Sequence, residues 1–310
     1  MKASVIICTR NRAQSLDRTL RSLTLMRKPA EGEWEIILVD NGSTDATPQV
    51  VASYESRLPI RRVVETTPGL SNARNKGVDE AKGDFIAWTD DDVEVNEDWL
   101  SAYLEAIETN PNAVVLGGKI IPSLDEPSTD WFRRNLNRLG ELAAHRDFGD
   151  QPLRLAPSDG IEPFGANFAI RLSTQRKFRY DPNLGVEPGN ERRGEEIDVI
   201  SRALANGGEG IWVPKSQVKH YITQARQTES YVQAYYTSQG HSIALNEYDS
   251  KAITVFGGPA SIWLKAWIYG AGRKLLRPLS EGLWVRSMIG HSVQTARLRV
   301  WRAGGKIPAA

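Results

Sequence analysis

The sequence predicts an α/β protein with a mostly parallel central sheet and helices on both faces. Short apolar segments rich in β-branched residues alternate with segments of helical periodicity, and the connections between them are short. With 40% apolar and 25% charged residues over 310 positions, the chain can bury a large core. This composition excludes disordered and collagen-like chains.

The first 121 residues predict five strands separated by helices. Residues 3–8 form a short apolar, β-branched run, and Leu16, Leu20 and Leu23 then recur at helical spacing. Pro48 suits the first turn of a later helix. The predicted strands are residues 3–8, 35–39, 60–64, 84–88 and 113–121, and the predicted helices lie at about 16–23, 48–54, 71–81 and 98–109.

Beyond residue 121 the periodicity weakens. Prolines at 122, 127, 152 and 157 indicate an irregular connection with one helix around residues 131–144. The later segments predict strands at 164–170, 210–213 and 217–221 and helices at 195–205 and 228–245. Residues 1–250 therefore form the predicted body of the protein, with an organisational change near residue 121.

The charges are distributed unevenly along the chain. The 39 Lys and Arg nearly balance the 38 Asp and Glu, which argues against a nucleic-acid binder. Residues 251–310 nevertheless hold ten bases, one acid (Glu281) and four of the nine tryptophans. We therefore predict a basic, Trp-rich helical extension over residues 251–310.

The single cysteine, Cys8, lies in an apolar run and cannot form an internal disulfide, so we expect a reducing compartment. The apolar run ends at once in a polar loop that contains Arg10 and Arg12, so it does not resemble a signal-peptide core. These observations predict a cytoplasmic protein.

Three consecutive carboxylates, Asp90, Asp91 and Asp92, follow a predicted strand. In an extended segment Asp90 and Asp92 would face the same side and could share Mg²⁺ or Mn²⁺, while Asp91 would face away or bond to the backbone. A helix N-cap cluster in a solvated loop would explain the same triplet.

Polar residues also follow the other predicted strands. Asp40 could bind a nucleobase or ribose, or it could only cap the following turn. In the first loop Arg10 and Arg12 could pair with phosphates or remain surface arginines. The sequence contains no dinucleotide-binding or Walker-type glycine motif and no zinc-spaced Cys/His cluster, so side chains and a metal must offset any phosphate charge.

An acidic helix start is the last candidate. Glu195, Glu196 and Asp198 would be stabilised by the dipole at a helix N-terminus. Glu196 could instead point inward, where a raised pKa would suit a general base.

Together these segments resemble the family 2 glycosyltransferases, the inverting nucleotide-sugar enzymes of the GT-A fold. The similarity covers about residues 1–245, and its specificity lies in the order of six short motifs. The matching stretches are residues 5–12, 37–45, 69–77, 89–92, 165–171 and 194–198.

The resemblance implies a donor site on the first half of the body. Thr9 and Arg12, with Arg10, would border the nucleotide, and Asp40 would bind its base. Arg74 would lie near the donor, and Asn75 would support its loop.

The Asp-x-Asp motif of the family matches Asp90 and Asp92, of which the second would bind Mn²⁺ or Mg²⁺ and the first would lie nearer the ribose. We also expect Asp91 to take part in binding the nucleotide-sugar. His220 matches a late histidine near the diphosphate, and a structural histidine would account for it equally well.

Gly165, Ala166 and Asn167 would shape the pocket of the nucleotide-sugar donor and the acceptor. Family members have Glu-Asp where this chain has Glu195-Glu196, with the second acid as the base. The resemblance therefore implies Glu196 as the catalytic base and leaves Glu195 as its rival.

The implied activity is transfer of a sugar, from a UDP-sugar in many members, to an acceptor hydroxyl of a glycan or lipid-linked glycan. Residues 1–250 would then be the catalytic domain, with a nucleotide-sugar half (1–121) and an acceptor half (122–250). Two alternatives are a non-catalytic nucleotide-sugar or glycan-binding module and a nucleotidyltransferase, which would release pyrophosphate.

The basic extension predicts a peripheral contact with the cytoplasmic membrane face. Residues 252–271 are long enough to suggest a spanning helix, but Gly257, Gly258 and Pro259 interrupt them and Lys265 lies inside, so we predict an interfacial or re-entrant segment. A second helix around residues 285–300 would bring four arginines to anionic lipid. The same helices could instead pack on the catalytic body or on a second subunit in a homodimer.

Overall fold

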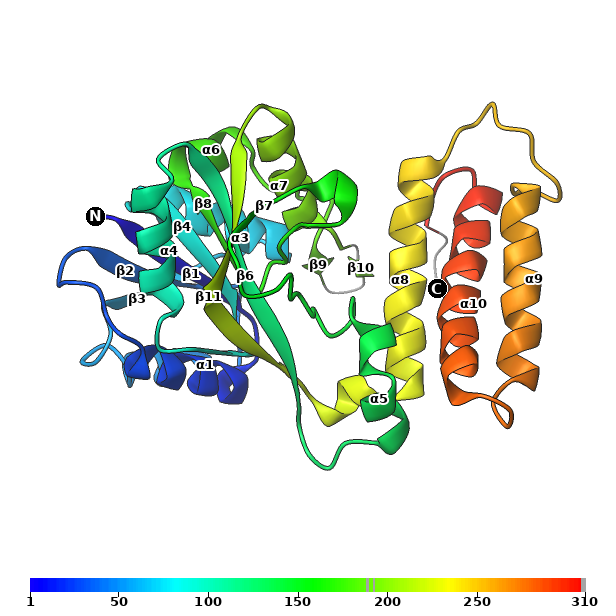
Figure 1. Cartoon of the computed structure of the whole chain (residues 1–310), viewed down its shortest axis with the longest axis horizontal. Coiled ribbons are helices and arrows are strands. Elements are labelled where there is room, and N and C mark those ends of the chain that lie inside the picture. The colour runs from blue at the N-terminus through cyan, green and yellow to red at the C-terminus, as the bar shows by residue number, and fades with distance from the viewer. Residues whose placement is uncertain (188–189, 192, 308–310) are drawn as a thin grey trace. The chain divides into compact units, whose positions relative to one another are not determined.

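The computed structural model describes residues 1–187, 190–191 and 193–307. Their contacts form two compact units, which Figure 1 draws together. The sheet unit consists of Met1–Ser123, Ala144–Asn190 and Gly194–Tyr221, and the helical unit consists of Leu124–Ala143, Glu191–Arg193 and Ile222–Ala310. The boundary predicted near residue 250 thus falls inside the helical unit, whereas the compact units divide at Tyr221.

The sheet unit is built on a nine-stranded sheet within the described residues, in the order β3-β2-β1-β4-β8-β6-β11-β5 with β7 paired to β11. The first four strands are parallel to one another, and β8 joins β4 in the antiparallel direction. The strands are β1 (Ala3–Thr9), β2 (Trp34–Asp40), β3 (Ile60–Val64), β4 (Phe85–Asp90), β5 (Val93–Val95), β6 (Ala113–Leu124), β7 (Leu153–Arg154), β8 (Asn167–Arg171) and β11 (Glu209–Ile222), with a separate pair β9 (Val186–Glu187) and β10 (Asn190–Glu191).

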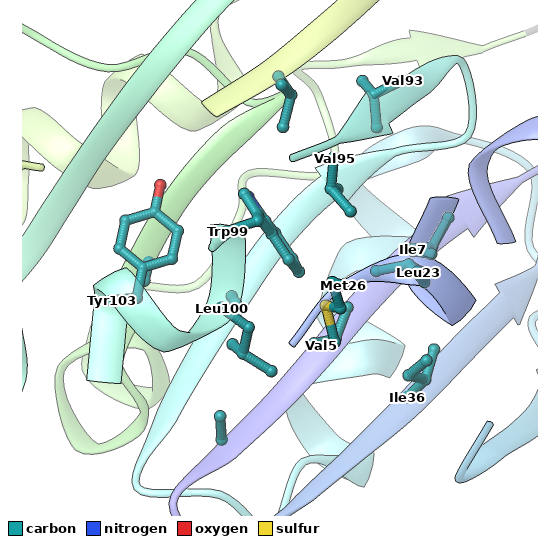
Figure 2. Packing of buried hydrophobic residues seen from close by; sticks show 14 of the residues in the cluster. Val5, Ile7, Leu23, Met26, Ile36, Val93, Val95, Trp99, Leu100 and Tyr103 are labelled. Atoms are coloured by element: carbon teal, nitrogen blue, oxygen red, sulfur yellow. The ribbon is translucent and has the colours of Figure 1, made fainter. Parts of the chain in front are cut away.

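Helices cover both faces of this sheet because the central strands are apolar on both sides. Alternation along β1 turns Val5 and Ile7 to one face and Ile6 to the other, and all three are fully buried. Figure 2 shows the first face, where Val5 and Ile7 lie among residues such as Leu23 and Trp99. The helices of the sheet unit are α1 (Ala13–Leu25), α2 (Thr47–Ala52), α3 (Leu70–Glu80), α4 (Trp99–Thr109), α6 (Leu172–Lys177) and α7 (Glu195–Ala205), with a 3₁₀ turn η2 (Pro157–Asp159).

Most of the predicted elements are present, but one prediction in the sheet unit and one in the helical unit differ from the structure. The two short strands expected at 210–213 and 217–221 are one continuous strand, β11. Pro214 breaks the apolar pattern there, yet the carbonyl of Ser216 accepts a hydrogen bond from Asn167 and the backbone stays extended. The single helix expected around residues 131–144 is wrong: in its place are α5 (Asp130–Arg134) and the 3₁₀ helix η1 (Leu136–Leu139).

The helical unit is organised around its last helix. In Figure 1, α10 (Glu281–Arg302) lies between α8 (Glu229–Glu247) and α9 (Ala260–Leu275), and η3 (Gln224–Gln227) precedes α8. Gly240 allows α8 and α10 to approach closely, because a Cβ there would lie 2.5 Å from the carbonyl oxygen of Val293. Phe132 and Leu139 join the same core with Trp284 and Met288.

One face of α10 is buried: Val285, Met288, Ala296 and Val300 pack inside the helical unit. The expected contact between the arginines of this helix and anionic lipid stays a prediction. No helix in the described part of the chain is both long and apolar enough to cross a membrane.

Candidate active site

The carboxyl ends of three neighbouring parallel strands bring the predicted acids to one edge of the sheet. Thr9, at the end of β1, is in register with Asp40 at the end of β2. On the other side of β1, Cys8 is in register with Asp90 at the end of β4. Ligands of α/β proteins bind at this edge, so the topology selects it as the candidate active site.

Arg12 joins the first loop to the acidic triplet. Its guanidinium donates to Asp91 Oδ1 at 2.7 Å and to Asp92 Oδ2 at 3.0 Å, while Thr9 Oγ1 donates to Asp91 Oδ2 at 2.6 Å. The carboxylate of Asp91 thus bonds to side chains and not to the backbone, which had been one of the two predicted alternatives; β4 ends at Asp90 and the chain then turns. Burial raises the pKa of Asp91 to about 7, against the attraction of Arg12.

Asp92 and His220 supply two candidate metal donors. His220, on β11, places Nε2 3.5 Å from Asp92 Oδ1, and both side chains are buried. No three His, Cys, Asp or Glu side chains among the described residues are close enough to enclose a metal ion alone. A carboxylate oxygen and an imidazole nitrogen, within electrostatic reach of Asp90, nevertheless fit Mn²⁺ or Mg²⁺ whose other positions are filled by phosphate oxygens or water.

Asp40 is engaged by its own surroundings. Its carboxylate is fully buried, accepts a hydrogen bond from the backbone N–H of Ser43 at 2.8 Å and pairs with Arg62 at 2.6 Å. Although burial opposes it, the hydrogen bonds from Ser43 and Arg62 lower the pKa of Asp40. This geometry favours the turn-capping role of Asp40 over direct contact with a nucleobase.

Arg62 was not among the predicted site residues. The parallel pairing of β2 with β3 sets Arg62 opposite Leu38, two residues before Asp40, which places its guanidinium within reach of that carboxylate. The ion pair with Asp40 thus fixes the guanidinium of Arg62, which is exposed at this edge of the sheet.

Arg74 is the buried centre of the site. From α3 it donates to Glu195 Oε1 at 2.9 Å and lies 3.6 Å from Glu196 and 3.7 Å from Asp90. The rings of Trp88 and Tyr180 lie 5.9 and 5.3 Å from its guanidinium carbon. These acids raise the pKa of Arg74 in spite of its burial, so Arg74 stays charged and links Asp90 to the acidic start of α7.

The two glutamates at the start of α7 have different environments. The side chain of Glu195 is 5% exposed and that of Glu196 is 18% exposed. Burial, together with the neighbouring charge of Glu196, raises the pKa of Glu195 to about 7. Glu195 is therefore the partner of Arg74, and Glu196 is the more accessible carboxylate.

Gly165 and Ala166, just before β8, have separate roles. A Cβ on Gly165 would lie 2.7 Å from Arg74 Nη2, so glycine is needed to leave the guanidinium in place, whereas the carboxylate of Glu196 would be 3.4 Å away. Ala166 accepts a hydrogen bond from Thr89 through its carbonyl.

Asn167 is a structural cross-link, which differs from its predicted place in the pocket. Its Oδ1 accepts hydrogen bonds from Trp99 Nε1 and the hydroxyl of Tyr103, and its Nδ2 donates to the carbonyls of Lys119 and Ser216. These four bonds use the full capacity of the buried amide.

Two remaining predicted residues lie at the border of the site. Asn75 bonds the backbone of Tyr180 through both ends of its amide, so it supports the segment that carries the ring beside Arg74. Arg10 is exposed at the end of β1. Tyr180 itself gave no sequence signal, because it lies outside every recognisable motif.

Residues 4–169, more than half of the chain, match the model of the family described as glycosyl transferase family 2. The chain belongs to this family. The matched residues include the strand ends that carry Thr9, Asp40 and Asp90, whereas Glu195, Glu196 and His220 lie beyond them. The resemblance identified from the sequence motifs is therefore confirmed.

Relatives of this family 2 glycosyltransferase come from several kingdoms. A glucosyl-dolichyl phosphate glucuronosyltransferase of Haloferax volcanii is 26% identical over 235 residues, which cover 73% of this chain and 71% of that protein. Polypeptide N-acetylgalactosaminyltransferase 11 of Xenopus tropicalis is 30% identical over 243 residues, 72% of this chain and 39% of that protein. The succinoglycan biosynthesis protein ExoM of Rhizobium meliloti is 35% identical over 113 residues, 36% of each protein.

Solved structures confirm the GT-A fold. The crystal structure of S. aureus TarS 1-349 has a TM-score of 0.56 at 18% identity and covers 98% of this chain and 92% of its own. GalNAc-T7, crystallised with UDP, GalNAc and Mn²⁺, has a TM-score of 0.57 at 20% identity over 82% of this chain and 52% of its own.

Proposed function

We propose that this chain is a metal-dependent, inverting glycosyltransferase that moves a sugar from a UDP-sugar to an acceptor hydroxyl. One observation carries the proposal: Arg74 lies within 3.7 Å of Asp90 on the donor side and within 3.6 Å of Glu196 on the acceptor side. A donor acid and a candidate base thus border the same buried cation. A binding module that only held a nucleotide-sugar would have no use for the second acid.

The donor would bind at the ends of β1 and β4. Arg12 and Arg74 would offset the charge of the diphosphate, and Thr9 would fix Asp91 behind it. Asp92 and His220, with Asp90 beside them, would hold a divalent cation. When bound, Mn²⁺ or Mg²⁺ stabilises the negative charge on the leaving nucleoside diphosphate.

Glu196 would act as the base. It would accept the proton of the acceptor hydroxyl while that oxygen attacks the anomeric carbon and the bond from that carbon to the diphosphate oxygen breaks. A single displacement inverts the anomeric configuration. Glu195, held by Arg74, would keep Glu196 in position, and the greater exposure of Glu196 supports this division of roles.

The acceptor class is the least specific part of the proposal. The relative from Haloferax volcanii is named for a lipid-linked glucosyl acceptor, and ExoM is named for succinoglycan biosynthesis. Polysaccharide or lipid-linked glycan synthesis is therefore the proposed setting, in the cytoplasm. UDP occurs in the GalNAc-T7 structure and in a structure of TarS, which supports a UDP-sugar donor.

The test is turnover of a panel of nucleotide-sugars by the full chain with Mn²⁺ and either a soluble glycan or a polyprenyl-diphosphate glycan. Release of free UDP together with an inverted glycosidic bond in the product would support the proposal. Donor binding without turnover would favour a binding module. Release of pyrophosphate from a nucleoside triphosphate would favour a nucleotidyltransferase.

A further inference from the structure

Large apolar side chains are exposed in one part of the chain. Of the twelve such side chains among the described residues, nine lie between residues 253 and 283. Contiguous exposed apolar surface of this kind marks a binding surface, whereas scattered apolar residues do not. Helix α9 and the loops on either side of it therefore need a separate explanation.

Helix α9 is apolar on two opposite faces. Ile262 and Ala266 are buried in a cluster with Leu298 of α10. The opposite face carries four exposed side chains at positions i, i+3, i+4 and i+11, the spacing of one helical stripe. They are Leu264, Trp267, Ile268 and Leu275, with exposed fractions of 60%, 72%, 50% and 66%.

Two exposed lysines border this apolar stripe. Each residue of an α-helix turns by about 100°, so Lys265, one residue after Leu264, and Lys274, one residue before Leu275, lie on opposite sides of the stripe. The single acid of residues 251–310, Glu281, accepts hydrogen bonds from Arg134 and Asn135. The exposed charges on α9 that border the stripe are therefore positive.

We propose that α9 docks this chain on an anionic lipid bilayer. The helix would lie in the headgroup region with Leu264, Trp267, Ile268 and Leu275 inserted and with Lys265 and Lys274 at the lipid phosphates. Apolar residues flanked by lysines are the pattern of interfacial helices, and tryptophan favours the membrane–water boundary.

The geometry of α9 argues for lying on the bilayer. Its 16 residues extend about 24 Å, less than the roughly 30 Å of a hydrocarbon core, and one of its faces is already packed on α10. A second copy of this chain would be a poorer occupant, because two-fold pairing through the stripe would bring the bordering lysines of both copies together. The positive border complements an anionic surface.

Vesicle flotation of the full chain tests this proposal without any nucleotide-sugar, so its result is independent of the proposed transferase activity. The chain should float with vesicles of phosphatidylcholine and phosphatidylglycerol at low salt, and less with phosphatidylcholine alone or at high salt. A Leu264→Ser/Trp267→Ser variant should lose at least about tenfold in partitioning. A Lys265→Gln/Lys274→Gln variant should lose roughly fivefold per lysine at low salt only.

Leu25→Ser is the matched control, because Leu25 is a 75% exposed leucine at the end of α1 in the sheet unit. It should float like the unchanged chain, and thermal unfolding should be the same for all variants, whose altered side chains are exposed. Equal flotation of the α9 variants and the unchanged chain would overturn the proposal. So would a chain that ignores vesicles but sediments as a dimer that Leu264→Ser/Trp267→Ser dissociates, which would make α9 a self-association surface.

Discussion

The guanidinium of Arg74 donates a 2.9 Å hydrogen bond to the carboxylate of Glu195, 121 residues later in the chain, and both side chains are 5% exposed. This pair fixes the start of α7 against α3. It also orients the remaining edge of the guanidinium toward Asp90 and Glu196. The consequences can be measured in stability and in activity.

Arg74→Ala should lower the free energy of unfolding by about 3–5 kcal/mol, because it removes one partner of a buried ion pair and leaves Asp90, Glu195 and Glu196 without their shared cation. Chemical denaturation followed by circular dichroism checks this value. Arg10→Ala, an exposed arginine at the same edge of the sheet, should stay within about 0.5 kcal/mol. Equal effects of the two substitutions would mean that the Arg74–Glu195 pair is not a stabilising feature.

Glu196→Gln should lower kcat by about 10² to 10⁴ with donor affinity unchanged, since the amide keeps the size of the side chain but cannot take the proton. Steady-state release of UDP and titration calorimetry with the donor separate the two effects. Glu195→Gln is the paired variant. If Glu195→Gln is the inactive one and Glu196→Gln keeps its turnover, the base has been assigned to the wrong member of the pair.

Asp92→Asn should abolish transfer, and a chelator should do the same to the unchanged chain until Mn²⁺ is added back. The substitution removes the charge of the candidate metal donor that faces His220. Asp84→Asn is the control, because Asp84 is exposed and precedes β4, whereas Asp92 follows the other end of that strand. It should keep full activity. Undiminished transfer in excess chelator would contradict the assignment of Asp92 and His220.

Gly165→Ala should displace the guanidinium of Arg74, because the added Cβ would lie 2.7 Å from its Nη2. We expect a loss of about 1–3 kcal/mol in stability together with a loss of turnover. Gly140→Ala would place its Cβ 3.7 Å from the carbonyl oxygen of Asn137, an ordinary van der Waals contact, and should leave both unchanged. Denaturation and UDP release, measured on both variants, give the comparison.

The raised pKa of Glu195 makes a pH prediction. Between the ordinary value of 4.5 and about 7 the folded chain keeps a proton on Glu195 that the unfolded chain has lost. The contribution of this group to stability is therefore complete below pH 4.5 and decreases as the pH rises toward 7. Relative to Glu195→Gln, the unchanged chain should lose stability across that window, which denaturation at several pH values would detect. If the free energies of unfolding of the two chains differ by the same amount at every pH, the pKa of Glu195 is not raised.

Hydrophobic periodicity in the sequence was sufficient to predict the helices and strands that have a clear local pattern. β3 (Ile60–Val64) and α7 (Glu195–Ala205) have the bounds that their sequence patterns predict. Helix α6 was missed because its six residues, Leu172–Lys177, are too short and too polar to show a helical repeat. The three-residue β5 was missed because its antiparallel pairing with β11 comes from tertiary structure.

The edge of the sheet at which the acids meet was also predictable, because parallel strands align their carboxyl ends. The partner of each acid was not. Arg12 on Asp91 and Asp92, Arg62 on Asp40 and Arg74 on Glu195 are contacts between residues 22 to 121 positions apart. Such contacts depend on how helices and loops pack over the sheet, which no local pattern records.

The helical unit is assembled from three separate stretches of the chain, of which Leu124–Ala143 and Ile222–Ala310 are the long ones and Glu191–Arg193 is the short one. During synthesis on a ribosome, Phe132 and Leu139 emerge about 150 residues before their core partners Trp284 and Met288. Until then these two side chains lack the partners that bury them. A chain shortened at residue 250 would leave those side chains and the face of α8 around Tyr236 uncovered for good. Removing residues 251–310 would therefore expose apolar surface and favour aggregation. Point substitutions on α9 are the better way to study the extension.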